Sequence, residues 1–206
     1  MSILKLPSNE IYHAIATNFD IEKLVEHLKS VVLPLDPQMQ APAFGGWSVL
    51  SSNRNYRDGW HRGHVLIKRD TRIEDLTKNL EQLGAKPCSE YIYPTEICSG
   101  YLLEVIDSIK ARGFSPRRAR IIKLCARSSS AWHRDAPDGF PLVRLHVPII
   151  TNPECFFEIE GDRCHLAADG SSYLIRVNRV HRVVNGGDSD RYHLVMDVVS
   201  NAPSIP

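Results

Sequence analysis

Two residues of types that bind metals, His133 and Asp135, lie two positions apart. In a β-strand the side chains of residues i and i+2 project from the same face, so the imidazole and the carboxylate would lie side by side. A second histidine, His181, follows 46 residues after Asp135. Two histidines and one carboxylate form the facial triad that holds non-haem Fe(II) and leaves coordination positions open. The chain has nine histidines, so this spacing alone is weak support for a metal site.

Two later segments alternate polar and apolar residues, as strands with two different environments do. In residues 144–149, Arg144 and His146 fall on one face and the aliphatic residues fall on the other. Residues 191–195 repeat this form, beginning with Arg191. Strands of this kind favour a barrel whose interior carries arginine and histidine, and which is therefore suited to hold an anion.

The segment Asn-Gly-Gly-Asp at residues 185–188 is a strong turn signal. A hairpin centred on Gly186 would place His181 opposite Arg191 on one face, although a change of register by one residue would remove that pairing. We therefore expect a hairpin that puts a guanidinium beside the metal. Guanidinium binds a carboxylate through two parallel hydrogen bonds, which fits a dicarboxylate co-substrate.

Several short motifs follow one another in the C-terminal part of the chain. They are RLHVPI at 144–149, LAADG at 166–170 with Tyr173, His181, VN at 184–185, RYHLV at 191–195, and Asp197. In order and spacing, including the ten-residue step from His181 to Arg191, they resemble the aspartyl/asparaginyl β-hydroxylase family. The first 115 residues contain no motif that matches.

Members of that family are Fe(II)- and 2-oxoglutarate-dependent dioxygenases with a double-stranded β-helix core. The resemblance implies that His133, Asp135 and His181 bind the iron. Some members have glycine in place of the ligand carboxylate, but this chain keeps Asp135, so its triad is complete.

Three further residues correspond to the family's contacts with 2-oxoglutarate. The resemblance implies that Arg191 binds the distal carboxylate of 2-oxoglutarate, and that Arg144 and His146 also face this co-substrate. It further implies a hydroxylase that uses O2. We expect a small-molecule substrate of amino-acid type, either a free amino acid or a small peptide-like metabolite, with an Asp or Asn residue as a further candidate.

Composition limits the class of protein. With 206 residues, 43% of them apolar, and a net charge of +1, we expect a single domain and no nucleic-acid partner. No apolar stretch approaches the roughly 18 residues of a membrane span, and residues 1–7 lack a signal-peptide hydrophobic region. The five cysteines include no Cys-x-x-Cys, so neither a disulfide framework nor a zinc ribbon is indicated, and a reducing cytoplasm is expected. The sequence does not indicate an oligomeric state.

The N-terminal part, residues 1–115, is expected to be a mostly helical flank that shapes the substrate site. Helices are predicted at 19–33, capped by Asp20, at 72–84, and at 95–112 with Gly113 at its end. Residues 34–46 are predicted as a loop and 47–51 as a short strand. The polar and aromatic segment 53–64 is either a surface loop or a lid over the substrate.

From residue 117 the hydrophobic period changes to two. Strands are predicted at 118–125, 143–150, 155–159, 163–166, 173–177, 180–184 and 191–198. Short strands separated by frequent turns are typical of a sandwich or barrel. We therefore predict a mainly β protein with flanking helices, whose double-stranded β-helix core, of the jelly-roll or cupin-like kind, occupies residues 116–200.

Other functions fit parts of the pattern. The triplet His133-Arg134-Asp135 also occurs in the catalytic loop of protein kinases, but the asparagine expected five residues later is replaced by Phe140, and no glycine-rich loop precedes it. A cupin-like metal-binding isomerase or sensor would use the same triad without 2-oxoglutarate, and Arg191 argues against it. A barrel that only binds a carboxylate ligand would not need the triad.

Overall fold

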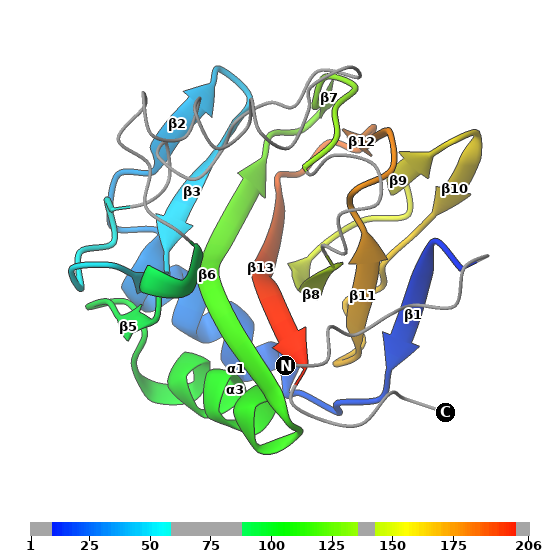
Figure 1. The fold of residues 1–206 in the computed structure, drawn as a ribbon. Helices are drawn as coiled ribbons and strands as arrows, with labels where there is room; N and C mark the ends of the chain where they lie inside the picture. Colours follow the sequence, from blue (N-terminus) through cyan, green and yellow to red (C-terminus); the bar gives the residue numbers. More distant parts are fainter. Residues whose placement is uncertain (1–9, 59–87, 136–142, 201–206) are drawn as a thin grey trace, which may run out of the picture.

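The structure, a computed structural model, describes residues 10–58, 88–135 and 143–200, and in this part the chain forms two main antiparallel sheets (Figure 1). The larger sheet has the strand order β1 (Tyr12–Ile15), β11 (Ser172–Arg176), β8 (Val143–Ile150), β13 (Arg191–Ser200), β6 (Phe114–Leu124), β3 (Phe44–Ser48) and β2 (Gln38–Ala41). The smaller sheet has the order β10 (Asp162–Cys164), β9 (Cys155–Ile159), β12 (His181–Asn185) and β7 (Ser128–Ser129). Strands β4 (Leu50–Ser51) and β5 (Tyr93–Pro94) form a separate pair. The predicted mainly β fold with a jelly-roll core is confirmed.

In the described part of the chain, two helices cover the outer face of the larger sheet (Figure 1). Helix α1 (Ile21–His27) begins as predicted at Asp20, whose side chain accepts a hydrogen bond from the backbone of Lys23 at 3.1 Å, and it continues into a π-helical turn, Leu28–Val32. Helix α3 (Gly100–Ala111) starts later than expected, because Thr95 is bound to the sheet through its backbone and its hydroxyl. Among the described residues no helix is long and apolar enough to cross a membrane.

Strands β8 and β13 lie side by side in the larger sheet and show the predicted alternation. Their apolar side chains, including Leu145, Val147 and Leu194, join the core beneath the helices. Their polar side chains point the other way, toward the smaller sheet. Arg144 and Asp197 are direct partners across the two strands. The interior between the sheets is therefore lined on one side by arginine and histidine, as the sequence indicated, and also by aspartate, which the sequence did not indicate.

The N-terminal part contains helices, as predicted, but its described residues also contain strands β1 and β2, which were not predicted. Residues 34–46, predicted as a loop, contain strand β2 and the start of β3, and β1 adds a further strand at the other edge of the larger sheet. The hydrophobic pattern did not predict the hairpin of β2 and β3 because the two strands approach closely at a glycine. A Cβ atom at Gly45 would lie 2.6 Å from the sulfur of Met39. Glycine permits that close approach but carries no apolar signal.

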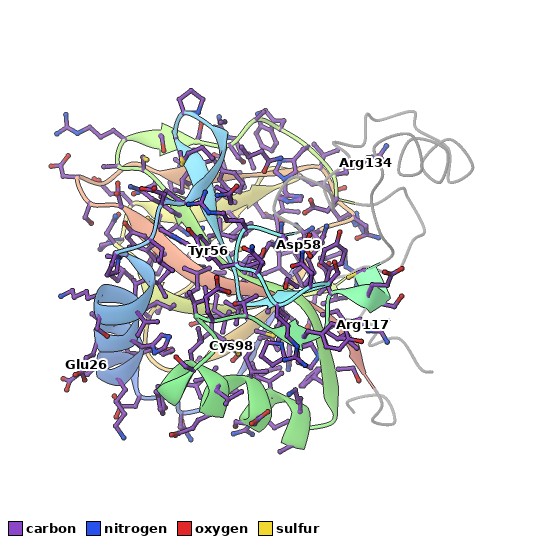
Figure 2. The ribbon with its side chains drawn as sticks, turned by 90° about the vertical axis from the view of Figure 1, so that its left-hand side faces the viewer. Glu26, Tyr56, Asp58, Cys98, Arg117 and Arg134 are labelled. Atoms are coloured by element: carbon purple, nitrogen blue, oxygen red, sulfur yellow. The ribbon has the colours of Figure 1, made fainter. Side chains whose placement is uncertain are left out.

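Part of the segment 53–64 is fixed to the sheet. The backbone and the hydroxyl of Ser52 donate to Asp58 Oδ2 at 2.8 and 2.6 Å, and Ser48 Oγ donates to the Asp58 carbonyl at 2.5 Å. Asp58 is labelled in Figure 2. The remainder of this segment and the helix predicted at 72–84 lie outside the described residues, so the lid hypothesis stays a prediction.

The predicted hairpin between His181 and Arg191 is wrong. Strand β12 belongs to the smaller sheet, where His181 pairs with Ile159, and β13 belongs to the larger sheet, where Arg191 pairs with Leu124. The side chain of Asn185 holds the crossing between the sheets, because its Nδ2 donates to the carbonyls of Leu124, Cys125 and Ser189 at 2.9–3.1 Å. The Asn-Gly-Gly-Asp segment therefore changes sheets instead of closing a hairpin.

Candidate metal centre

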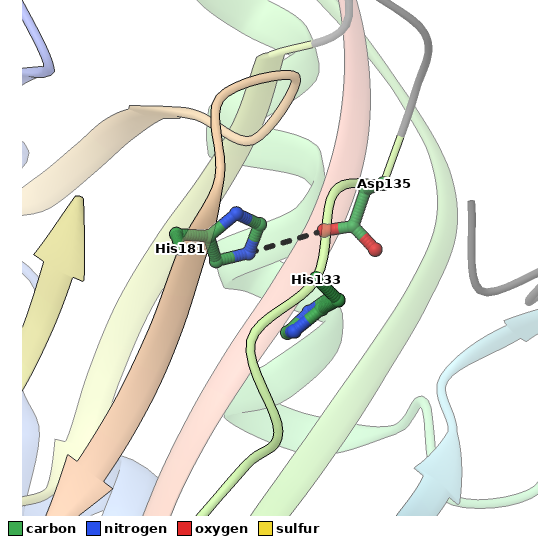
Figure 3. Close-up of side chains that lie close together, drawn as sticks. All are labelled: His133, Asp135 and His181. Atoms are coloured by element: carbon green, nitrogen blue, oxygen red, sulfur yellow. Dashed lines mark ion pairs between the residues drawn. The ribbon is translucent and has the colours of Figure 1, made fainter. Parts of the chain in front are cut away.

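His133 and His181 face each other across an isolated β-bridge. The backbone N–H of each donates to the carbonyl of the other at 2.9 Å, and their ring centroids are 4.4 Å apart. Asp135 brings its carboxylate to the same place, so that the three potential ligand atoms all lie within 4.8 Å of one another (Figure 3). The predicted triad is assembled in space, although His133 is held by this bridge and not by the continuous strand that the i, i+2 argument assumed.

Both histidines are oriented by backbone carbonyls. His133 Nδ1 lies 2.7 Å from the Ala131 carbonyl oxygen, and His181 Nδ1 lies 2.8 Å from that of Arg179. A carbonyl oxygen only accepts, so each Nδ1 carries a proton, and in the neutral form of the ring Nε2 keeps its lone pair. Burial lowers the pKa of His133, which favours the neutral ring that a metal requires. Such carbonyl contacts are typical partners of metal-binding histidines.

Arg144 joins Asp135 to a second buried carboxylate, Asp197. Its Nη1 donates to Asp135 Oδ2 at 2.5 Å, and its Nε donates to Asp197 Oδ1 at 2.9 Å. Arg118 donates to Asp197 Oδ2 from Nε at 3.0 Å and from Nη2 at 2.9 Å. Burial tends to raise the pKa of both carboxyl groups, but the neighbouring guanidinium groups outweigh it, so both pKa values lie below the usual range. The sequence motif included Asp197 without indicating this role.

Removal of the Asp197 charge is expected to destabilise the protein strongly. In Asp197→Asn, the buried guanidinium groups of Arg118 and Arg144 lose the carboxylate that both contact, and breaking a buried ion pair in this way costs about 3–5 kcal/mol. Urea unfolding would measure the loss in free energy. The control is Asp188→Asn, because the Asp188–Arg127 pair is exposed and an exposed pair contributes at most about 1 kcal/mol. Equal losses in the two variants would contradict the prediction.

Arg191 is buried in the interior, only 3% exposed. Its Nη2 donates to His193 Nδ1 at 2.8 Å, and its guanidinium lies 5.5 Å from the centre of the Phe157 ring. Burial lowers the pKa of Arg191 to about 10, so the group remains a cation at neutral pH. No carboxylate of the described residues pairs with it. The contact with His193 was missed by the sequence analysis, although the i, i+2 spacing on one strand would have indicated it.

His146 is also buried, and its ring lies between aromatic neighbours. Its centroid is 5.2 Å from that of Phe157 and 6.0 Å from that of His193. Neither ring nitrogen of His146 has a hydrogen-bond partner within the described part of the chain. Buried polar groups normally have partners. The two open nitrogens of His146 therefore indicate a polar ligand or ordered water at this position.

The buried side chains of His146 and His193 predict a dependence of stability on pH. Burial, followed by the charge of Arg191, lowers the pKa of His146 and of His193 well below the usual value. Below about pH 6.5 the unfolded chain protonates these rings and the folded chain does not, so stability falls by about 1.4 kcal/mol per pH unit for each ring. Urea unfolding of metal-free protein between pH 7 and 5 measures this slope. In His146→Leu, we expect the slope of stability against pH to decrease by the contribution of one ring, about 1.4 kcal/mol per pH unit. An unchanged slope would contradict the lowered pKa of His146.

Two adjoining cavities meet at the triad. The inner cavity, of about 40 Å³, reaches from the triad to His146, Phe157 and Arg191. The outer cavity, of about 220 Å³, extends toward β2 and β3, where Gln40 and Phe44 line it. The structure thus brings all six predicted site residues to the inner cavity, including Arg144, which borders both cavities.

Comparison with a protein-family model gives a match over residues 96–201, slightly more than half of the chain. The model is described as Aspartyl/Asparaginyl beta-hydroxylase. A comparison with curated protein sequences finds no match. The family match covers every residue of the triad, and it begins well before the motifs that carried the resemblance in the sequence.

Comparison with solved structures gives matches at low sequence identity. HygX from Streptomyces hygroscopicus, solved with nickel and 2-oxoglutarate bound, has a TM-score of 0.50 and 10% sequence identity, covering 94% of this chain and 84% of that chain. An oxidoreductase of the 2OG-Fe(II) oxygenase family from Burkholderia pseudomallei has a TM-score of 0.49 and 12% identity, covering 99% and 98%. At these identities the similarity to HygX supports the fold alone.

Proposed function

The chain belongs to the aspartyl/asparaginyl β-hydroxylase family, and from that premise we propose that it hydroxylates a substrate of amino-acid type with Fe(II) and 2-oxoglutarate. In this proposal His133, Asp135 and His181 bind the iron. Arg191 binds the distal carboxylate of 2-oxoglutarate, and the substrate is a free amino acid, a small peptide-like metabolite, or an Asp or Asn residue.

The donor set fits Fe(II). Two imidazole nitrogens and one carboxylate are the ligands of non-haem iron oxygenases, and three protein ligands leave positions for a co-substrate and oxygen. The carbonyl contacts of His133 and His181 direct a free Nε2 of each ring away from the backbone. The lowered pKa of Asp135 keeps its carboxylate ionised and able to bind a metal.

The observation that carries the proposal is Arg191. It is a buried cation in the same narrow cavity as the triad, and no carboxylate of the described residues neutralises it. A buried charge is costly unless it is paired. A dicarboxylate that reaches from the metal toward Arg191 would supply the missing partner. The neutral ring of His146, neither of whose nitrogens has a partner in the described part of the chain, offers one further donor toward the same space.

Bound together, Fe(II) and 2-oxoglutarate would supply the oxidation, in which O2 converts 2-oxoglutarate to succinate and carbon dioxide and one oxygen atom enters a C–H bond of the substrate. The chain's own residues bind and orient. His193 fixes the guanidinium of Arg191 through Nδ1, which, as the acceptor, must be unprotonated. Phe157 and Val195 help to exclude water from the inner cavity. The outer cavity is large enough for a small substrate and opens on the triad.

The test is 2-oxoglutarate turnover before any substrate is known. Purified protein with Fe(II), ascorbate and 2-oxoglutarate is expected to consume oxygen and release succinate slowly. An amino-acid screen would follow, in which the substrate increases this rate. If the protein binds Fe(II) but consumes no 2-oxoglutarate, with or without the screen, the proposal fails, and a cupin-like metal-binding isomerase or sensor becomes the better explanation of the triad.

A further inference from the structure

Four buried charged groups form a continuous chain that ends at the triad. Arg118 contacts Asp197, Asp197 contacts Arg144, and Arg144 contacts Asp135. The side chains of Asp197, Arg144 and Asp135 are between 5% and 7% exposed. Such a chain costs free energy to desolvate, and replacing buried ion pairs by apolar residues is often neutral for stability. A contribution to stability alone therefore does not explain why the protein has this chain of buried charged groups.

The chain of contacts is fixed at the end that lies away from the metal. Arg144 and Asp197 are direct partners on the adjacent strands β8 and β13, in the middle of the larger sheet. Asp197 accepts from both arginines and from the thiol of Cys88, at 3.2 Å. The direction of the Arg144 guanidinium is therefore set by the sheet and not by the metal site.

Asp135, by contrast, has little secondary structure to hold it. It follows the isolated bridge at His133, and its backbone N–H donates to the Val177 carbonyl at 2.9 Å. The hydrogen bond from Arg144 Nη1 limits the rotation of its carboxylate, and Asp135 Oδ2 lies 3.5 Å from His181 Nε2. A metal ligand must be held within about 0.5 Å of its productive position to bind well.

We propose that Asp197 and Arg144 position Asp135 for metal binding, so that Arg144 acts through the ligand carboxylate and is not chiefly a contact of 2-oxoglutarate. This inference rests on the proposed function, since it assumes that the triad binds Fe(II). It differs from the role that the family resemblance implies for Arg144. The nitrogens Nε and Nη1 are occupied by carboxylates of the chain itself, and only Nη2 has no partner in the described structure.

The test measures metal affinity apart from turnover. Titration calorimetry with Mn(II), without 2-oxoglutarate, would be applied to the wild-type protein, Asp197→Asn and Arg144→Lys. Lysine keeps the charge but cannot bridge two carboxylates as the guanidinium fork does. We expect the dissociation constant for Mn(II) to rise about 10–100-fold in both variants, as is typical when a partner of a metal ligand is lost. The affinity of the metal-loaded variants for 2-oxoglutarate should stay unchanged.

A matched control separates positioning from simple loss of stability. Leu102→Ala removes a fully buried side chain of α3, which costs about 2–5 kcal/mol, so it destabilises the fold comparably at a site that does not line either cavity. We expect its affinity for Mn(II) to equal that of the wild type, with circular dichroism confirming that every variant is folded. If Asp197→Asn fails to fold, Arg144→Lys decides the question.

Two results would overturn the inference. One is unchanged Mn(II) affinity in the folded variants. The other is a loss of 2-oxoglutarate affinity with metal affinity intact, which would make Arg144 a direct contact of the co-substrate. Failure of the proposed function would look different: the wild type would bind Mn(II) and respond to the substitutions as expected, yet consume no 2-oxoglutarate with Fe(II).

Discussion

His133→Ala is expected to abolish metal binding and 2-oxoglutarate turnover. The substitution removes one of three protein ligands and leaves a histidine and a carboxylate, which cannot form the facial arrangement. The loss of Mn(II) affinity should exceed the roughly 10–100-fold change that follows loss of a partner outside the ligand set. Calorimetry gives the affinity, and succinate release in the presence of Fe(II) gives the turnover.

The matched control for this prediction is His165→Ala. In the structure His165 Nδ1 donates to the Cys155 carbonyl at 2.7 Å, and His165 is not among the residues that line the two cavities. We expect this variant to bind Mn(II) and release succinate as the wild type does. If the two variants lose metal affinity equally, or if His133→Ala keeps it, the triad is not the metal site.

The strands of the C-terminal part were predictable because polar and apolar residues alternate along them, and the apolar residues are the ones that are buried. In β8 and β13 every second residue is apolar and packs beneath the helices, and the predicted ranges 143–150 and 191–198 agree with the observed strands within two residues at each end. The same signal is absent from β2 and β3, where Gly45 and Gly46 carry no side chain to report burial. Their pairing depends on a close backbone approach, which a hydrophobic pattern does not record.

The triad and Arg191 were predicted together, but the assumed geometry was wrong for Arg191. A turn signal was taken to mean a hairpin, whereas the segment crosses from one sheet to the other. His181 and Arg191 still line one cavity because the inner faces of the two sheets oppose each other. The alternation in the sequence indicates which side chains of a strand point inward. It does not indicate which sheet the strand joins, because here the crossing is held by hydrogen bonds of the Asn185 side chain.

The network around Asp197 could not be inferred from periodicity. Arg118 and Asp197 are separated by 79 residues in the sequence. The alternation of polar and apolar residues is also the same whether an inward polar side chain contacts a ligand or another residue of the chain. The sequence has four arginines between residues 112 and 120, a pattern that fits either a solvated cluster or partners of acidic residues. The structure supports pairing for Arg118, which is buried and bound to Asp197.

Arg191→Met is expected to weaken 2-oxoglutarate binding without weakening metal binding. Truncating one partner of a buried, hydrogen-bonded charge pair costs about 2–5 kcal/mol, which corresponds to a rise in the dissociation constant of roughly thirtyfold or more. Arg191→Lys keeps the charge but loses the two parallel hydrogen bonds, so its loss should be intermediate. The measurements are calorimetric titrations of 2-oxoglutarate into Mn(II)-loaded protein and of Mn(II) into each variant.

The stability of the protein without ligands distinguishes a binding arginine from a structural one. In the described residues Arg191 has no carboxylate partner, so the free protein bears the cost of a buried cation, and methionine of similar length should leave the free energy of unfolding equal or higher. If Arg191 belonged to a structural ion pair, its replacement would lower the free energy of unfolding, as we expect for Asp197→Asn. If Arg191→Met lowers the free energy of unfolding by the several kcal/mol expected for Asp197→Asn, then Arg191 is a structural residue. Another cationic group would then have to bind the distal carboxylate of the co-substrate.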